Sequence, residues 1–281
     1  MSVGSSFGER LHRALRDRGP LCVGIDPHTS LLAAWGLPDD VSGLERFSRT
    51  VVEALAGQVA VLKPQSAFFE RQGARGVAVL QDVVADARSA GALVLTDAKR
   101  GDIGSTMQAY ADAYADPRSP LFSDAVTVSP YLGFGSLTPL LDTAERHGTG
   151  VFVLALTSNP EGAELQHART SSGRTVAGTV LEHVRRRNAE ARPAPLGSVG
   201  CVVGATVGRT AEDLDVGGPL LAPGLGAQGA GPDDLRGLFG PALRLVLPAV
   251  SREVLAGGPA VSALRDSATR LRDACARAIA G

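Results

Sequence analysis

Short apolar runs alternate with amphipathic segments along this chain. The runs are hydrophobic at successive positions, which is typical of strands covered on both faces. They predict strands at about 21–25, 59–63, 92–95, 124–130, 150–156, 199–203, 219–223 and 243–248. Hydrophobic residues at helical spacing predict helices at about 7–18, 42–56, 68–90, 103–114, 137–146, 176–191 and 261–280. The pattern therefore predicts an α/β protein with a parallel sheet.

Eight strands that alternate with helices are the pattern of a (β/α)8 barrel, the TIM barrel. The length of 281 residues suits one such barrel, which commonly needs about 250 residues. We therefore expect a single domain over 1–281, with an extra N-terminal helix at about 7–18 and a polar insertion at about 161–173. An open, doubly wound sheet is the alternative fold, but no G-x-G-x-x-G motif follows the first strand.

Polar side chains follow the ends of most predicted strands. The carboxyl ends of all strands gather at one mouth of a barrel, where active sites lie, so these side chains should converge there. Together they form the candidate site: Asp26, Lys63, Asp97, Lys99, Ser158, Gln228 and Arg252.

The third strand runs into an Asp-x-Lys-x-x-Asp pattern, formed by Asp97, Lys99 and Asp102. Side chains alternate along a strand, so Asp97 and Lys99 should point the same way, with Asp102 beyond a turn. Only two of the 28 lysine and arginine residues are lysines, Lys63 and Lys99, and both follow apolar runs. An ammonium can release a proton, whereas a guanidinium cannot. Both lysines are therefore candidates for a chemical role. The Asp-x-Lys-x-x-Asp pattern taken alone would also fit a solvated turn with a surface ion pair.

Four of these residues alternate in charge and would form a chain of ion pairs: Lys63, Asp97, Lys99 and Asp102. Such contacts keep both lysines protonated. A lysine held as an ammonium is a proton donor and a poor Schiff-base nucleophile, which disfavours an aldolase of the imine type.

A glycine-rich segment, 224–231, follows the seventh strand, and Arg252 follows the eighth. In many barrels this corner binds phosphate through backbone N–H groups, with a cation nearby. The sequence therefore predicts a phosphorylated small molecule as the substrate. For the glycines alone, a flexible loop is the alternative.

Composition and spacing argue against several classes of function. A net charge of −1 with no basic cluster argues against nucleic acid or an anionic membrane as a partner. No apolar run approaches the length of a membrane span, and residues 1–13 lack a signal-peptide core, so we expect a cytoplasmic protein. Cys22, Cys201 and Cys275 form no C-x-x-C pair and are expected to be core thiols. No set of His, Cys and carboxylate residues has metal-ligand spacing, so no metal site is predicted.

Four segments together resemble orotidine 5′-phosphate decarboxylase, in particular its longer bacterial branch. They are D-A-K-R-G-D-I-G-S-T at 97–106, G-I-D-P-H at 24–28, Lys63-Pro64, and P-G-L-G-A-Q-G at 223–229. The resemblance spans nearly the whole barrel. It implies a lyase without a cofactor that converts orotidine 5′-monophosphate to UMP in pyrimidine biosynthesis.

The resemblance also implies a role for the residues of the charge chain. Lys99 would protonate C6 of the pyrimidine, and Asp97 would face the departing carboxylate. Lys63 and Asp26 would hold ribose hydroxyls and complete the charge chain.

Further roles follow from the same resemblance. Ser158 would read the pyrimidine amide, and Gln228 and Arg252 would close over the phosphate. Asp102 and Thr106 would come from the second subunit of a homodimer, so that the two subunits share each active site.

Two other functions stay open. A metal-dependent phospho-sugar aldolase or synthase could use the same barrel, because related synthases share the Asp-x-Lys-x-x-Asp pattern. A non-catalytic nucleotide-binding barrel is the other possibility, against which the two retained lysines argue.

Overall fold

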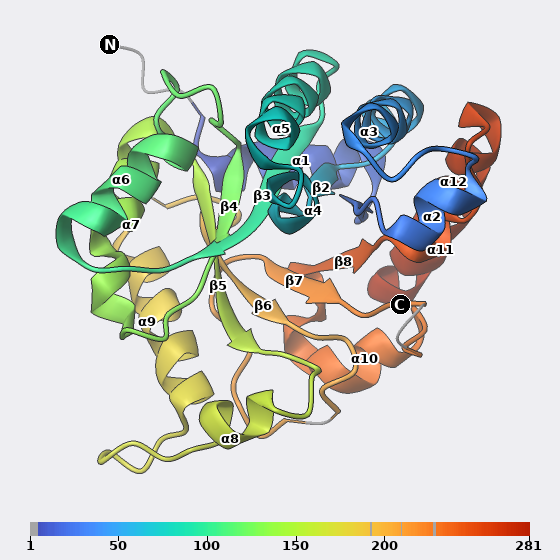
Figure 1. The fold of residues 1–281 in the computed structure, drawn as a ribbon. Helices are drawn as coiled ribbons and strands as arrows, with labels where there is room; N and C mark the ends of the chain where they lie inside the picture. Colours follow the sequence, from blue (N-terminus) through green and yellow to red (C-terminus); the bar gives the residue numbers. More distant parts are fainter. Residues whose placement is uncertain (1–4, 192, 209, 227–228) are drawn as a thin grey trace.

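Eight parallel strands close into a barrel in the computed structural model, which describes residues 5–191, 193–208, 210–226 and 229–281 (Figure 1). Each strand pairs with the next one in the sequence, and β8 pairs with β1. The strands are β1 Cys22–Ile25, β2 Val61–Pro64, β3 Leu93–Arg100, β4 Ala125–Val128, β5 Gly150–Leu156, β6 Val199–Val203, β7 Leu220–Pro223 and β8 Val246–Val250. The predicted TIM barrel is confirmed.

Helices surround the barrel (Figure 1). The longer ones are α1 Phe7–Arg18, α3 Val41–Leu55, α5 Gly73–Ser89, α6 Gly104–Ala115, α7 Thr138–His147, α9 Val176–Glu190 and α12 Val261–Ala280. The short ones are α2 Thr29–Ala34, α4 Ser66–Glu70, α8 Gly162–Gln166, α10 Asp234–Phe239, α11 Arg252–Leu255 and the 3₁₀ helices η1 Phe134–Leu137 and η2 Gly240–Leu245. Periodicity predicted the longer helices but not the short ones, because one or two turns contain too few apolar positions to show a helical period.

Two predicted elements need correction. The helix predicted at 68–90 is broken: α4 ends at Glu70 and α5 begins at Gly73, whose φ of 63° lies in the left-handed region that glycine favours. The last strand begins at Val246 rather than 243, because Leu243 and Leu245 are buried within η2 instead. A short apolar run fits a buried strand and a buried helix equally well, so its residue pattern could not separate the two.

Helix α1 packs across the amino-terminal end of the strands. The Phe7 ring meets Phe152 of β5 edge to face, with ring centroids 6.0 Å apart. The Gly8 amide donates to Ser198 Oγ at 3.0 Å, just before β6. At Gly150, the first residue of β5, a Cβ atom would lie 2.2 Å from the Phe7 ring, so glycine is required there. With this end covered, the carboxyl ends of the strands form the open mouth.

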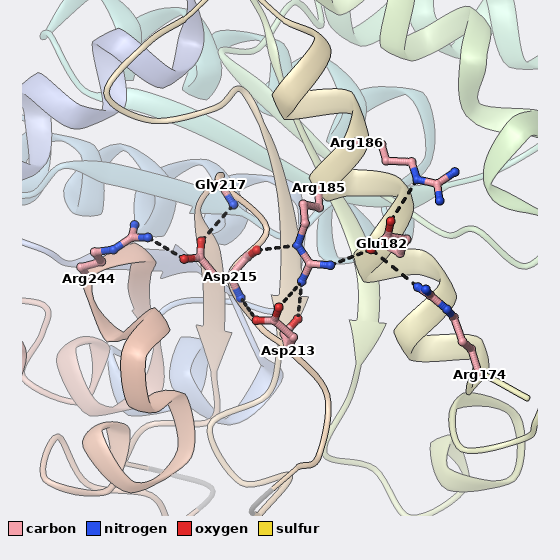
Figure 2. Close-up of polar contacts among 8 residues, drawn as sticks. All are labelled: Arg174, Glu182, Arg185, Arg186, Asp213, Asp215, Gly217 and Arg244. Atoms are coloured by element: carbon pink, nitrogen blue, oxygen red, sulfur yellow. Dashed lines mark hydrogen bonds and ion pairs between the residues drawn. The ribbon is translucent and has the colours of Figure 1, made fainter.

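The connection 204–219 between β6 and β7 has no helix in its described residues. Charged side chains hold it against the outside of the barrel instead (Figure 2). Arg185 of α9 donates to the carbonyl oxygens of Asp213 and Asp215 at 3.1 and 2.9 Å, and Arg244 of η2 pairs with the Asp215 carboxylate at 2.7 Å. Arg185 is 33% exposed and Arg244 and Asp215 are 62% and 44% exposed, so each ion pair adds little stability, whereas the hydrogen bonds to carbonyl groups fix the path of the connection.

The predicted polar insertion at 161–173 contains α8 and a tight turn, which an antiparallel bridge between Arg169 and Thr175 closes. A cavity of about 320 Å³ lies between this turn, α9 and the connection 204–219. Its lining includes Arg174, Arg185 and Glu212 but none of the predicted site residues. Arg174 and Arg185 are paired with carboxylates there, so this cavity is part of the charged outer wall rather than of the mouth.

Candidate active site

Lys63 and Asp97 meet at the carboxyl ends of β2 and β3. Lys63 Nζ donates to Asp97 Oδ2 at 2.9 Å, and Lys99 Nζ donates to the other carboxylate oxygen, Oδ1, at 2.7 Å. The Lys63 and Asp97 side chains are only 9% and 10% exposed, but that of Lys99 is 45% exposed. The structure therefore brings together three of the four predicted members of the charge chain, with Lys99 at the end that a small molecule can reach.

The surroundings of Lys63 and Asp97 keep both of these groups ionised. Burial alone would lower the pKa of Lys63, but the negative charges of Asp97 and Asp26 outweigh it, and the pKa lies above its ordinary value. Burial alone would raise the pKa of Asp97, but the two ammonium groups bring it well below the ordinary carboxyl range. The carboxylate is therefore charged at neutral pH and fixes the position of both ammonium groups.

The backbone at Lys99 is not that of a regular strand. Its φ of 49° makes it the one non-glycine residue in the described part of the chain with a positive φ, a conformation that stores about 1–3 kcal/mol of strain. Thr96 pairs with Val126 and Arg100 pairs with Val128, so the register between β3 and β4 shifts across this segment. Asp97 and Lys99 do meet, as their spacing predicts. The lysine side chain is oriented by a bulge, however, and not by the regular alternation of side chains along a strand.

Thr127 of β4 is a buried residue that the sequence analysis did not single out. Its Oγ1 donates to Asp97 Oδ1 at 2.8 Å and accepts the Lys99 amide proton at 3.0 Å. The signal for it was weak: one hydroxyl residue within the otherwise apolar strand Ala125–Val128. A second polar neighbour, Gln65, accepts a longer hydrogen bond from Lys99 Nζ at 3.4 Å.

Asp26 lies just beyond the end of β1. Its Oδ1 is buried without a hydrogen-bond partner, and so is the hydroxyl of Ser251 beyond β8. The two residues are neighbours, because a Cβ atom on Gly24 would lie 2.8 Å from the Asp26 carboxylate and 3.0 Å from Ser251 Cβ. Buried polar atoms are almost always hydrogen-bonded, so this pair is suited to hydroxyl groups of a ligand at the mouth.

Asp102 does not join the charge chain of its own subunit. Its carboxylate accepts the Ile103 amide proton at 2.8 Å, and among the described contacts no hydrogen bond or ion pair links it to Lys63 or Lys99. Thr106 is exposed on the first turns of α6, and the Ile103 side chain is 62% exposed. Within one subunit, these residues lie apart from the ammonium groups.

Ser158 and Arg252 lie on other loops of the mouth. Ser158 follows β5 and lies beside Gly204, at the end of β6. Arg252 is the first residue of α11 and is exposed. The neighbouring Glu253 side chain packs against Gly226, so the glycine-rich loop after β7 lies next to α11 as predicted. Gln228 lies outside the described residues.

The three cysteines and His28 lie in surroundings that indicate a structural role. The three thiols are buried, and burial raises the pKa of Cys22 to about 12 and that of Cys275 to about 11. His28 packs edge-on against the Phe68 ring at 4.5 Å.

Among the described residues no group of three or more His, Cys, Asp and Glu side chains could hold a metal ion. None of the described helices is long and apolar enough to span a membrane.

Comparisons with known proteins agree on one family. Residues 19–266 match the model of the orotidine 5′-phosphate decarboxylase / HUMPS family. Orotidine 5′-phosphate decarboxylases of Salinispora arenicola and Streptomyces coelicolor are each 66% identical, over 98% and 94% of this chain and 99% and 95% of their own. A crystal structure from Streptomyces avermitilis, described as a candidate orotidine 5′-phosphate decarboxylase, is 65% identical with a TM-score of 0.96, over 99% of this chain and 97% of that one.

Proposed function

The chain belongs to the orotidine 5′-phosphate decarboxylase family and converts orotidine 5′-monophosphate to UMP, and we propose that Lys99 is the group that protonates C6. The predicted family and activity are thereby confirmed, and the aldolase and non-catalytic alternatives are set aside. The observation that carries the role of Lys99 is the ion-pair chain Lys63, Asp97, Lys99, which ends in a partly exposed ammonium group.

The reaction demands a fixed positive charge. When the bond from C6 to the carboxylate breaks, its electron pair stays on C6 in the plane of the ring, where the π system cannot delocalise it. An ammonium group at about 4 Å stabilises such a charge by roughly 4 kcal/mol at an effective dielectric of 20. The carboxylate leaves as CO2 when this bond breaks, and the Lys99 ammonium then transfers its proton to the electron pair on C6.

Asp97 serves this step by holding Lys99. Its two oxygens accept from the two lysines, so the ammonium of Lys99 is aimed before the substrate arrives. In our proposal Asp97 also faces the substrate carboxylate, and the repulsion between the two negative charges is relieved as CO2 departs.

One lysine cannot supply the whole rate enhancement, because enzymes lower barriers by about 8–23 kcal/mol. Contacts with the rest of the nucleotide must therefore organise the site. In our proposal Asp26 and Lys63 bind ribose hydroxyls, which would give the buried Asp26 Oδ1 its missing partner. Ser158 reads the pyrimidine amide, and Arg252 and Gln228 bind the phosphate.

We further propose that the active form is a homodimer with composite sites. The support is twofold. Asp102 is separate from the charge chain of its own subunit, and large apolar residues are exposed both next to it, at Ile103, and in the segment after β4, at Tyr131 and Leu132, with exposures of 62%, 74% and 53%. Exposed apolar residues of this kind beside an incomplete site are suited to a second copy of the chain, which would bring Asp102 and Thr106 to the neighbouring site.

The role of Lys99 is tested by the loss of absorbance of orotidine 5′-monophosphate with purified protein treated with EDTA. The wild type should stay active, and the Lys99→Ala variant should lose at least about 10⁴-fold in kcat while still binding UMP. Substantial turnover by Lys99→Ala would exclude Lys99 as the proton donor. Loss of wild-type activity on metal removal would contradict the prediction that no cofactor is needed.

The composite site is tested by subunit exchange. Lys99→Ala and Asp102→Ala should each be nearly inactive, but a hybrid dimer contains one intact site. After full exchange, roughly a quarter of the wild-type activity should return. No recovery despite verified exchange would place Asp102 in the site of its own subunit. A cytoplasmic location stays a prediction from the sequence.

A further inference from the structure

We propose that Thr127 is a positioning residue for the decarboxylation: its hydroxyl group fixes both the backbone and the ammonium partner of Lys99. It does not touch the substrate in this proposal. The inference rests on the proposed role of Lys99, and three observations around β3 and β4 support it.

The first observation is the direction of the hydrogen bonds at Thr127. The Lys99 amide can only donate, so Oγ1 accepts at that contact, 3.0 Å long. The Asp97 carboxylate is ionised and can only accept, so the single hydroxyl proton of Thr127 points to Oδ1, at 2.8 Å. One hydroxyl group thus satisfies a main-chain donor and a catalytic carboxylate at once, and the sense of both bonds is fixed.

The second observation is the conformation that this contact supports. Lys99 has a φ of 49° on the bulge between the two strands, and such a conformation persists only where surrounding contacts fix it. The amide of Lys99 donates to the Thr127 side chain within this bulge. The Thr127 side chain therefore holds the bulged backbone of β3 by a hydrogen bond from β4.

The third observation is that one carboxylate oxygen, Asp97 Oδ1, links the Thr127 hydroxyl group to the Lys99 ammonium group. Asp97 Oδ1 accepts from Lys99 Nζ at 2.7 Å and from Thr127 at 2.8 Å. Without the hydroxyl group, the carboxylate can rotate about its remaining bonds to the lysines, and the lysine backbone can relax. A displacement of the reacting group by about 1 Å can reduce the rate by about 100-fold.

Thr127 is 1% exposed, so a change there does not alter the surface that binds the nucleotide. The hydroxyl group should therefore matter for kcat more than for KM. A residue that only stabilised the fold would affect neither constant in the folded protein.

The test replaces Thr127 with valine, which keeps the shape of the side chain and removes the hydroxyl group. We expect kcat to fall about 10- to 100-fold, with KM and the affinity for UMP within about threefold of the wild type. Thr127→Ser keeps the hydroxyl group and should restore kcat to within about threefold. Wild-type kcat in Thr127→Val, or equal losses in Thr127→Val and Thr127→Ser, would overturn the proposal.

A second pair of variants tests the proposal if the Thr127→Val protein does not fold. Thr127→Ser and Thr127→Ala both lose the methyl group and differ only in the hydroxyl group, so kcat should be at least about tenfold lower in the alanine variant. Equal kcat values in this pair would also overturn the proposal.

A matched control lies on the neighbouring strand. Thr96 is also 1% exposed, and its hydroxyl group bonds to Ser123 Oγ at 2.6 Å, away from the lysines. Thr96→Val should lower the melting temperature and leave kcat unchanged. The Lys99→Ala variant separates the two hypotheses: if it is inactive while Thr127→Val has full activity, only the role of Thr127 fails, and if it is active, the proposed function of Lys99 fails.

Discussion

Two buried carboxylates lie at opposite ends of the barrel and differ in the cations that hold them. At the mouth, Asp97 lies between Lys63 and Lys99. At the amino-terminal end, Asp124 accepts from Arg10 of α1 at 3.0 Å and from Arg88 of α5 at 3.3 Å. Their side chains are 10% and 8% exposed, so burial does not distinguish them.

The difference lies in what each cation can do. A guanidinium keeps its proton and offers several donors, so Arg10 and Arg88 tie two helices to the start of β4. Asp124 also accepts the Val94 amide proton at 3.0 Å, which joins β3 to the same point. An ammonium is a single charge that can transfer a proton. On the proposed mechanism, the choice of cation, rather than burial, makes one ion cluster a reaction centre and the other a structural clamp.

The sharpest way to break this comparison is to neutralise each carboxylate in turn. Asp97→Asn should lower kcat by at least about 10³-fold, because Lys99 loses its partner. Asp124→Asn should leave kcat unchanged and reduce the free energy of unfolding by about 2–3 kcal/mol, because two partly buried arginines lose their charge partner. The assay for orotidine 5′-monophosphate and urea unfolding measure the two effects. An Asp124→Asn protein that is folded but inactive would contradict the assignment of a structural role to Asp124 and a catalytic role to Asp97.

At the mouth, Arg252→Ala tests the phosphate corner. A hydrogen bond to a charged group contributes about 1.5–3 kcal/mol, so KM should rise and UMP affinity should fall by about 10- to 100-fold. Steady-state kinetics and calorimetric titration with UMP measure the change. Arg16→Ala, on the exposed face of α1, is the control and should alter neither value. An unchanged KM in Arg252→Ala would move the phosphate site elsewhere.

The low pKa of Asp97 predicts a dependence of stability on pH. The folded state lowers this pKa, so its contribution is present above the unfolded value of about 3.9 and is lost as the pH falls toward the folded value. Between pH 5.5 and 3.0, the wild type should lose about 1 kcal/mol more of its free energy of unfolding than Asp97→Asn. Urea unfolding at both pH values gives the difference. Equal losses would show that the carboxyl titrates normally in the folded protein.

The smallest expected effect comes from Arg88→Lys, which keeps the charge at the structural end. The substitution removes the planar donor geometry toward Asp124 and the contact of the guanidinium with the Phe122 ring, at 4.5 Å. The free energy of unfolding should fall by about 0.5–1 kcal/mol, with kcat unchanged. Arg16→Lys, whose side chain is 73% exposed, should show no measurable change in unfolding. A loss of kcat in Arg88→Lys would show that this cluster is coupled to the mouth.

The barrel and the composition of its mouth could be predicted from the amino-acid pattern alone. Eight apolar runs, most of them followed by polar residues, predict parallel strands, and the topology of a closed barrel gathers their carboxyl ends. The spacing of Asp97 and Lys99, together with the scarcity of lysine, identified residues that form a hydrogen bond in the structure. The long helices, such as α1 and α12, were also predictable, because their apolar stripes repeat over several turns.

The orientation of the charged groups, in contrast, depends on contacts between strands and could not be predicted from the pattern. The left-handed backbone of Lys99 and its bond to Thr127 arise where β3 and β4 pair with a shifted register. The separation of Asp102 from the lysines of its own chain depends on the path of the loop into α6. The contact between Lys99 and Thr127 joins residues 28 positions apart, and both features depend on strand pairing and packing. A pattern of neighbouring residues contains no information on such contacts, and for the same reason it missed the short helices, which packing rather than periodicity defines.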